Sequence, residues 1–561
     1  MPYASRWKID IPNTHLATLL LKSPTAPLSK TNKAFIEAAR PETHYLTPHA
    51  FRLWSQRFAA GLLKSGLQPG DRVLLFSGND LFFPVILMGV IMAGGIFTAA
   101  NPTYVARELA YQLQDSGATY LLCAGSSLPT GLEAAAQAGL PRSRVFVFDS
   151  DVFDGSHSSF PQSGCAYWGA LIASVEEGEA FAWEELGSAG LADRTLALNY
   201  SSGTTGRPKG VEITHKNYVA NVLQHTHLTT LRKGYEVRKA SMRWLCFLPM
   251  YHAMAQTIFI AGALVHGTPV YIMPKFDFQK MLEYTQAFRI TDLTLVPPVV
   301  VMLAKHPLVK EYDLSSVDTV GSGAAPLGRE VCAEVERLWP AGVINIKQGW
   351  GMTEATCSIL GWDPTETSDS ASVGEPNANC EAKIMADDVT EITARNQRGE
   401  LWVRGQNIMK GYWRNPTATK ETKTDDGWLR TGDIAYVDDQ GKFHVVDRMK
   451  ELIKVKGNQV APAELEAIIL EHAAVADVAV IGVTIDHDER PRAYVVLNPG
   501  QSATSEEIVR FMDGKVSATK RITGGVKFVE AIPKNPSGKI LRAVLREQAR
   551  AELKQRATAK L

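Results

Sequence analysis

The chain has 561 residues, too many for one hydrophobic core, so several domains are expected. Its 59 basic and 59 acidic side chains give a formal net charge of zero, which argues against a general nucleic-acid binder. Six cysteines are scattered without a CxxC pair, so neither a zinc site nor a disulfide framework is indicated. The first residues, Met1 to Arg6, lack the apolar core of a signal peptide, so we expect no secretory signal.

Helix and strand patterns alternate from the start of the chain. Thr47-Pro48 opens an expected helix, and 72–76 reads as a strand. The apolar stretch 81–100 is long enough to span a membrane, but Pro84 and three glycines interrupt it and no basic cluster flanks it. We therefore expect no transmembrane span there, but a buried helix over 81–93 and a buried strand over 96–99.

A turn rich in glycine and hydroxyl groups runs from Ser201 to Gly210, behind an apolar run expected to be a strand. Glycines let backbone N–H groups approach an anion, hydroxyls can donate to phosphate oxygens, and Lys209 adds a positive charge. The residue order is not that of a Walker A loop. A flexible linker is the alternative, but it gives no reason for the Pro-Lys-Gly end, so the pattern predicts phosphate binding.

The alternation continues and predicts an α/β fold with parallel sheets covered by helices. Helices are expected over 217–227, 255–265 and 278–288, and strands over 244–248, 270–273, 292–296, 319–320 and 343–347. His252 follows one of these strands, where open α/β sheets bind ligands, and this favours a functional histidine over a core one. Small residues over 321–326 would let a flat ring lie against the backbone.

The segment 348–354 combines an aromatic ring, a hydroxyl and a carboxylate. Trp350 could stack on a base, Thr353 could bind a phosphate, and Glu354 could hold Mg²⁺, which prefers one or two carboxylates plus substrate phosphates. With the phosphate turn elsewhere, the segment indicates a nucleotide–Mg²⁺ site. Further on, the Asp433 carboxylate suits two ribose hydroxyls.

A charged connector over 447–451 marks a domain boundary, and a small α+β domain is expected beyond it. Its last loop, 533–540, presents Lys539 before a final helix. That helix has the four-residue spacing typical of a solvated basic face, with Arg542, Arg546, Arg550 and Lys554. The final Ala559-Lys560-Leu561 resembles the peroxisomal address Ser-Lys-Leu, so a peroxisomal import receptor is an expected partner; the alternative is a frayed helix end, with the protein in the cytoplasm.

Together these segments resemble the adenylate-forming superfamily of acyl-CoA synthetases, luciferases and peptide-synthetase adenylation domains, most nearly the 4-coumarate–CoA ligase-like enzymes. The motifs lie at 201–210, 323–326, 348–354, 431–433, 447–450 and 536–539. The resemblance implies a large N-terminal domain, 1–448, of mixed, mostly parallel sheets with flanking helices plus a small β region. Residues 449–561 would form a small mobile α+β cap with its hinge at Lys450.

The resemblance also implies two half-reactions, with ATP, Mg²⁺, coenzyme A and a small carboxylic acid. The acid attacks the α-phosphorus of ATP to give acyl-AMP and pyrophosphate, and the thiol of coenzyme A then displaces AMP. Lys539 would bridge the carboxylate and the α-phosphate, with His252 beside the carboxylate. Glu354 and Thr204 would bind Mg²⁺.

Further roles are implied position by position. Thr204, Thr205 and Lys209 would hold the β- and γ-phosphates, and Thr353 the α-phosphate. Adenine would lie between Ala325 and Trp350, and the ribose would bind Asp433 and Arg448. The other implied nucleotide contacts are Ser201, Ser202, Gly203, Gly206, Gly323, Ala324, Gln348, Gly349, Gly351 and Met352.

For the thioester step the resemblance implies that Gly457 lines a pantetheine tunnel, with Lys454 and Gln459 as catalytic residues nearby. The implied acid pocket comprises Ala253, Met254, Gly323, Gly349, Cys357 and Ser358. Met254 and the Cys357-Ser358 pair depart from the coumarate ligase pattern and indicate an apolar, adaptable floor. Aryl acids, hydroxycinnamate- or phenylacetate-like, and medium-chain acids both remain open.

Two other classes are weighed. A luciferase-like or carrier-protein-loading enzyme would keep the first half-reaction, but no carrier motif follows Lys539. A non-catalytic nucleotide sensor would be expected to lack Lys539 or Glu354, and both are present.

Overall fold

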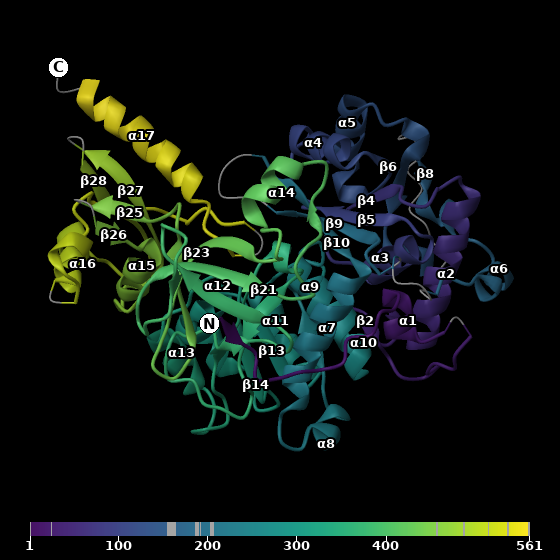
Figure 1. Cartoon of the computed structure of the whole chain (residues 1–561), viewed down its shortest axis with the longest axis horizontal. Coiled ribbons are helices and arrows are strands. Elements are labelled where there is room, and N and C mark those ends of the chain that lie inside the picture. The colour runs from purple at the N-terminus through teal and green to yellow at the C-terminus, as the bar shows by residue number, and fades with distance from the viewer. Residues whose placement is uncertain are drawn as a thin grey trace.

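The computed structural model describes residues 2–558 apart from 24, 154–163, 186–189, 191, 202–206, 456–457, 486–487, 514 and 536–537, and it leaves out the side chains of 554–558. Figure 1 shows a large body of sheets and helices, with the C-terminal part at one end of the long axis. Two mostly parallel sheets flanked by helices confirm the predicted α/β class.

The first large sheet carries the predicted phosphate turn. From β9 to β8 its neighbours pair in parallel, while β9, β10 and β22 pair antiparallel. Its order is β22 (Gly411–Tyr412), β10 (Lys209–Thr214), β9 (Thr195–Ser201), β5 (Ile96–Ala100), β4 (Arg72–Phe76), β6 (Ala118–Ala124), β7 (Val145–Phe148), β8 (Ala166–Tyr167).

The second large sheet is parallel except for its last pair, β2 and β3. Its order is β15 (Lys347–Gln348), β14 (Thr319–Ser322), β13 (Asp292–Leu295), β11 (Trp244–Cys246), β12 (Val270–Ile272), β2 (Phe35–Glu37), β3 (Tyr45–Leu46). Strand β11 precedes His252, and strand β14 leads into the 321–326 segment. Both pair in parallel with β13, so their carboxyl ends meet at one edge of the sheet.

Helices flank these sheets. They are α1 (Leu16–Leu21), α2 (Pro48–Lys64), α3 (Phe83–Met92), α4 (Ala106–Ser116), α5 (Leu128–Ala138), α6 (Val175–Ala180), α7 (His215–Thr230), α8 (Tyr235–Lys239), α9 (Ala253–Ala255), α10 (Ala263–His266), α11 (Phe278–Ala287), α12 (Pro297–Lys305), α13 (Arg329–Glu336) and α14 (Pro416–Thr422).

The apolar stretch considered as a membrane span forms α3 and β5, and every residue of α3 is buried in the protein core. A Cβ added at Gly89 would lie 2.7 Å from the Phe58 ring and 2.9 Å from the Ser55 carbonyl oxygen of α2. This glycine therefore serves close packing of two helices. Within the described residues, no helix is both long and apolar enough to cross a membrane.

A third, antiparallel sheet follows in the chain: β1 (Tyr3–Ala4), β19 (Glu381–Met385), β21 (Gly399–Arg404), β23 (Leu429–Val437) and β24 (Phe443–Arg448), with β20 (Glu391–Ile392) beside β19. A small sheet joins β16 (Trp350–Gly351), β17 (Ser358–Gly361) and β18 (Glu375–Pro376). The third sheet ends at Arg448, next to the predicted hinge, but the boundary between 448 and 449 stays a prediction.

The C-terminal part has a β-hairpin, β25 (Ile453–Val455) and β26 (Asn458–Val460), and a sheet of β27 (Val475–Ile485), β28 (Asp488–Leu497) and β29 (Val526–Phe528). Alternate residues of β27 face opposite sides. Val478 and Val480 pack with α15 (Pro462–Leu470) and α16 (Ser505–Met512). Ala479 and Ile481 pack with α17 (Arg542–Thr558), seen in yellow in Figure 1.

The C-terminal part docks against α12 of the large body. The Lys305 ammonium donates hydrogen bonds to the carbonyl oxygens of Leu470 and Val475, at 2.8 and 2.5 Å. A Cβ added at Gly538 would lie 3.2 Å from the Pro298 ring. The loop before Lys539 therefore rests on the first turn of α12.

Two predicted elements differ from the structure. The helix expected over 255–265 is only partly α-helical: α9 and α10 enclose η5, a π-helix over Gln256–Gly262. Apolar periodicity does not distinguish the two helix types here, because every residue over Gln256–Gly262 is buried and no one-sided pattern marks the period. The strand expected over 343–347 reduces to β15, since only residues 347 and 348 find a partner on β14.

The prediction of a solvated basic face on α17 is wrong for two of its arginines. The Arg542 guanidinium donates to both oxygens of Glu466 at 2.7 Å, and Arg546 pairs with Glu451. Burial raises the pKa of Glu466, and Arg542 opposes that rise. Arg542 also stabilises the charge of Asp447, whose Oδ2 accepts from the Ala463 amide at 3.0 Å. Sequence spacing alone does not show that these carboxylates face the helix.

Replacing Arg542 by Met is expected to destabilise the C-terminal part by about 3 kcal/mol, because Glu466 would be left buried without its cation. Hydrogen exchange of β27 in the full chain measures this loss. Arg550→Met, at an exposed position of α17, should change it by less than about 0.5 kcal/mol. The double variant Arg542→Met with Glu466→Met should recover part of the lost stability. If Arg542→Met and Arg550→Met destabilised the C-terminal part equally, the role of the ion pair would be contradicted.

Candidate active site

Lys539 is held by a turn that begins at Asn535. The Lys539 amide donates to Asn535 Oδ1 at 2.8 Å, and the Asn535 amide donates to the Lys539 carbonyl oxygen at 2.9 Å. Gly538 has a φ of 81°, a backbone conformation that favours glycine. The turn directs the Lys539 side chain into the large body, where it is close to Arg448, Asp433 and Glu354.

The Lys539 ammonium is desolvated. Burial and the Arg448 guanidinium lower its pKa to about 8, while Asp433, Glu451 and Glu354 act in the opposite direction. The structure therefore gathers side chains from 354, 433, 448 and 539, which the sequence separates by up to 185 positions, around one lysine. A cation kept out of water is a strong binding partner for an anionic ligand.

Asp433 lies on β23 opposite Arg448 of β24. Its Oδ2 accepts a hydrogen bond from Trp350 Nε1 at 2.9 Å, and its Oδ1 lies 3.2 Å from Arg448 Nε. Burial raises the pKa of Asp433, and the Arg448 and Trp350 contacts oppose the rise. Asp433 thus contacts both Trp350, predicted beside the base, and Arg448, predicted at the ribose.

Glu354 is buried in a short 3₁₀ turn, η7 (Thr353–Ala355). Its Oε1 accepts a hydrogen bond from the Tyr412 hydroxyl at 2.9 Å, and its carbonyl oxygen accepts from the Met409 amide at 2.8 Å. The Lys209 ammonium lies 4.8 Å from the centre of the Tyr412 ring. Tyr412 thus links the predicted metal ligand to the predicted phosphate turn. The sequence interpretation missed it, because a Gly-Tyr pair 58 residues from Glu354 carries no recognisable signal.

The phosphate turn is the tip of the β9–β10 hairpin, in which Ser201 pairs with Lys209. Five predicted contacts, Ser202, Gly203, Thr204, Thr205 and Gly206, lie outside the described residues. Helix α4 holds both ends of the turn: Asp115 accepts from the Tyr200 hydroxyl at 2.6 Å, and the Tyr111 hydroxyl donates to the Pro208 carbonyl oxygen at 2.9 Å. Sequence reasoning did not find these two α4 residues.

The segment 321–326 lies beside Gly349. The Gly349 amide donates to the Ser322 carbonyl oxygen at 3.0 Å. Gln348 makes two hydrogen bonds to the Leu327 backbone, at 2.9 and 3.0 Å, so its side chain positions this segment. Ala324 has a φ of 72°, a strained value for a residue with a Cβ, and the neighbouring Ala325 is half-buried. Met352 follows β16 directly and precedes the 3₁₀ turn of Thr353 and Glu354.

The predicted acid pocket gathers around Gly323. A Cβ added there would lie 3.7 Å from both Met254 Sδ and the Gly349 carbonyl oxygen. His252 is the residue before α9, and burial and the positive Lys539 lower its pKa, so the ring is neutral near pH 7. Ala253 is buried in the first turn of the same helix.

Cys357 and Ser358, also predicted for the acid pocket, contact Gly351 and helix α7. Gly351 presses against the Cys357 carbonyl, which would lie only 1.7 Å from an added Cβ. The Ser358 carbonyl oxygen accepts from Asn221 Nδ2 of α7 at 2.5 Å. The structure therefore brings Met254, Gly323 and Gly349 together and places His252 near Lys539.

The residues predicted for the thioester step lie elsewhere. Lys454 and Gln459 are exposed and face each other across the β25–β26 hairpin, and the Lys454 amide donates to Glu489. Gly457, between them, lies outside the described residues. Lys450 occupies the turn between β24 and β25. Among the described residues, the arrangement brings Glu354, Asp433, Arg448 and Lys539 together and leaves Lys454 and Gln459 on the C-terminal part.

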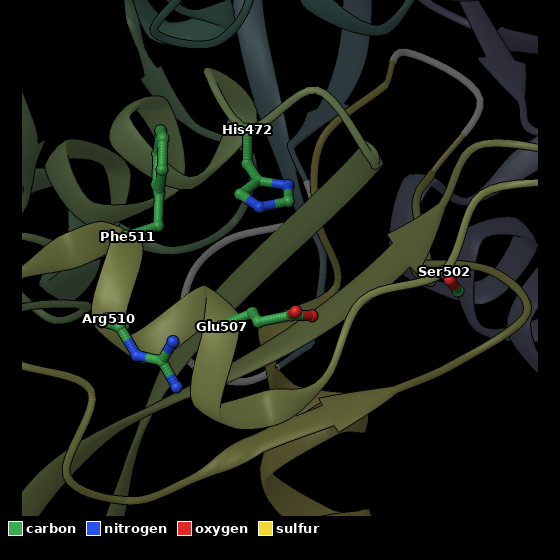
Figure 2. A pocket seen from close by; sticks show the side chains of 5 residues that line it. All are labelled: His472, Ser502, Glu507, Arg510 and Phe511. Carbon is green, nitrogen blue, oxygen red and sulfur yellow. The ribbon is translucent and has the colours of Figure 1, made fainter.

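A surface hollow of about 410 Å³ on the C-terminal part is lined by His472, Ser502, Glu507, Arg510 and Phe511. Figure 2 shows Glu507, Arg510 and Phe511 on one helix, α16, with His472 across from it. The His472 and Phe511 rings meet edge to face, 5.0 Å apart. None of the predicted site residues lines this hollow, so it is separate from the region around Lys539.

The chain matches known protein families over most of its length. Residues 26–413 match the AMP-binding enzyme family, and residues 464–539 match the AMP-binding enzyme C-terminal domain. The chain is 38% identical over 506 residues to 4-coumarate–CoA ligase 2 of Nicotiana tabacum, covering 89% of this chain and 88% of that protein. It is 35% identical over 554 residues to the phenylacetyl-CoA ligase epaB of Aspergillus niger, covering 98% and 99%.

Solved structures with a similar fold match nearly the whole chain. ATP-bound MatB from Rhodopseudomonas palustris is 28% identical and matches with a TM-score of 0.79, covering 95% of this chain and 98% of that one. The anthranilate CoA ligase AuaEII in complex with anthranoyl-AMP matches with a TM-score of 0.81 at 21% identity, covering 96% and 98%, which shows the shared fold.

Replacing Arg448 by Gln is expected to raise the pKa of Lys539 above its value of about 8, because a positive neighbour is lost and Asp433 loses its partner. The pH dependence of Lys539 modification by an amine-selective reagent, followed by mass spectrometry, gives this value. Arg550→Gln, on the exposed side of α17, should leave it unchanged. The same midpoint in Arg448→Gln and the unsubstituted protein would contradict the proximity of the two cations.

Proposed function

The chain belongs to the AMP-binding enzyme family, and from this premise we propose that it is an ATP-dependent acyl- or aryl-CoA ligase. It would join a carboxylic acid to the α-phosphate of ATP, releasing pyrophosphate, and then transfer the acyl group to the thiol of coenzyme A, releasing AMP. The observation that carries this proposal is Lys539, desolvated among Glu354, Asp433 and Arg448.

The first step brings two anions together. A carboxylate must approach the α-phosphorus of a triphosphate, and their repulsion has to be offset by positive charge. We assign that role to Lys539 at the carboxylate and to Lys209 at the triphosphate. His252, neutral and next to Lys539, can donate or accept a hydrogen bond at the carboxylate without adding charge.

The site fits a magnesium ion. Glu354 supplies one buried carboxylate, and its Oε2 accepts no hydrogen bond from the described residues, so an oxygen remains available as a ligand. No group of three or more His, Cys, Asp or Glu that could hold a metal occurs among the described residues. Magnesium commonly binds through one carboxylate plus substrate phosphates, and it would supply charge neutralisation at the phosphates. Thr204 is the second proposed ligand.

The second step needs another arrangement of the C-terminal part. We propose that residues 449–561 rotate about Lys450, withdrawing Lys539 and bringing Lys454, Gln459 and Gly457 toward the acyl-AMP. The exposed side chains of Lys454 and Gln459 on the β25–β26 hairpin support this, because exposed side chains can approach a new surface. Coenzyme A is favoured over a carrier protein or water, since relatives similar over nearly the whole chain are named CoA ligases. Their names also favour an aryl acid over a medium-chain acid.

A pyrophosphate-release assay with a panel of aryl and aliphatic acids, each with and without coenzyme A, tests the function. We expect pyrophosphate release from ATP only with a suitable acid, and an acyl-CoA product only when coenzyme A is added. Chelation of Mg²⁺ should stop both. Adenylate formation without any thioester product would favour a luciferase-like or carrier-loading enzyme, and ATP binding without turnover would favour a sensor.

Replacing Lys539 by Ala is expected to lower the rate of acid-dependent ATP–pyrophosphate exchange on the order of 10²–10³-fold or more, because a charge contact to the reacting groups is lost. Thioester formation from supplied acyl-AMP should be largely retained. The control is Lys534→Ala. Lys534 lies five residues before Lys539 and pairs with Asp477, so its loss should affect neither step. Equal loss of both steps in Lys539→Ala would contradict the assignment.

We also propose peroxisomal import through Ala559-Lys560-Leu561, which lies outside the described residues. Removing these three residues from a fluorescent fusion should move it from peroxisomes to the cytoplasm. An unchanged distribution would contradict the address.

A further inference from the structure

The connection between β4 and α3 carries a buried asparagine, Asn79, three residues after the end of β4. Its side-chain amide reaches across to the second large sheet. Asn79 Nδ2 donates to the carbonyl oxygens of Leu248 and Met273, both at 3.1 Å, and Oδ1 accepts from the Met250 amide at 2.8 Å. A side chain that follows a strand of the first sheet therefore holds two segments of the second, the one after β11 and the one after β12.

These partners suit an asparagine amide. Two of them are carbonyl oxygens and the third is an N–H, so the amide has one orientation in which all three bonds form. An aspartate would place a carboxylate against both carbonyl oxygens, and a serine hydroxyl has only one hydrogen to donate. A Cβ added at Gly78 would lie 3.5 Å from the Pro274 carbonyl oxygen, so the residue before Asn79 also lies beside the segment after β12.

The place of these bonds in the second sheet connects them to the site. Strand β12 pairs with β11 on one side and β13 on the other, so the direction in which the chain adds strands reverses at β11. In open α/β sheets, ligands bind outside the carboxyl ends of the strands at such a reversal, here between β11 and β13. Asn79 binds on the other side, between the ends of β11 and β12. It therefore fixes the end of β11 from the side away from the expected ligand.

His252 ends the segment that Asn79 holds. The His252 amide donates to the Pro249 carbonyl oxygen at 3.0 Å, which closes a turn with Met250 as its second residue. Because the Met250 amide is bound by Asn79, the first sheet sets the position of this turn. Lys539 is close enough to act on the His252 ring. A misplacement of about 1 Å near reacting groups can lower a rate about 10²-fold, so the position of the turn matters for catalysis.

We propose that Asn79 is a positioning residue for adenylate formation, which holds His252 beside Lys539 and the carboxylate of the acid by binding the Met250 amide. The proposal rests on the ligase function proposed above and adds to it a residue outside the predicted motifs. Asn79 acts through His252 and not on a substrate. The predicted contacts to base and ribose lie on β16, β23 and β24, so ATP binding should not depend on Asn79.

A double-mutant cycle on the kcat/KM of acid-dependent pyrophosphate release tests this. Asn79→Ala should lower kcat/KM for the acid on the order of 10–10²-fold, with the KM for ATP within about twofold. In a His252→Ala background the same substitution should cost less than about twofold, because the group that it positions is already gone. The control is Gln56→Ala on α2, which removes another buried amide, bonded to the Phe181 carbonyl oxygen at 2.8 Å, and should leave both values within about twofold.

Hydrogen exchange in the full chain gives a second measurement that needs no substitution. In the unsubstituted protein the Met250 amide should exchange at least about 10²-fold more slowly than an unstructured amide, because it is buried and bonded to Asn79. Asn79→Ser, the milder variant, should speed exchange over 248–252 and leave β27 unchanged. If Asn79→Ala does not fold, Asn79→Ser takes its place in the cycle.

Three results would overturn the proposal. They are a Met250 amide that exchanges at the unstructured rate, equal losses from the Asn79 substitution in the two backgrounds, or a loss confined to the KM for ATP. Equal losses would mean that Asn79 only stabilises the fold. All three can occur in an enzyme that still forms acyl-CoA, so they leave the ligase function intact. A complete absence of acid-dependent turnover in the unsubstituted protein would instead overturn the ligase function, and this proposal with it.

Discussion

One lysine, kept out of water and between charges of both signs, is the constraint on which the rest of the structure depends. A desolvated ammonium with a pKa near 8 is costly to hold, and the Arg448 guanidinium beside it adds to the cost. Asp433, Glu354 and Glu451 compensate only in part. Such an arrangement is stable enough to persist but is best satisfied when further negative charge arrives, which is what a triphosphate and a carboxylate provide.

The supporting contacts are divided between two parts of the chain. Tyr412 and helix α4 fix the phosphate turn and Glu354 within the large body, through hydrogen bonds of 2.6–2.9 Å. On the other side of the predicted hinge, Arg542 neutralises Glu466 and stabilises the charge of Asp447. Because Asp447 lies on β24, before the predicted hinge, Arg542 also couples the C-terminal part to the large body, as Lys539 does at Asp433 and Glu354.

Local patterns predicted much of this molecule and missed what depends on side-chain direction. The buried α3, the strand before the phosphate turn and the edge where His252 lies follow from periodicity and strand order. The π-helix does not, because all seven of its residues are buried and leave no one-sided apolar pattern from which to read the period. Tyr412 and Arg542 were missed for a different reason: their partners are 58 and 76 residues away, and only the folded chain brings them into contact.

The docking of Lys305 onto the C-terminal part has a dynamic consequence. Its ammonium gives two hydrogen bonds to the Leu470 and Val475 carbonyls, and water can replace both when the parts separate. A hydrogen bond from a charged donor contributes about 1.5–3 kcal/mol net. The rotation proposed above would therefore have to release this contact and form it again in each cycle.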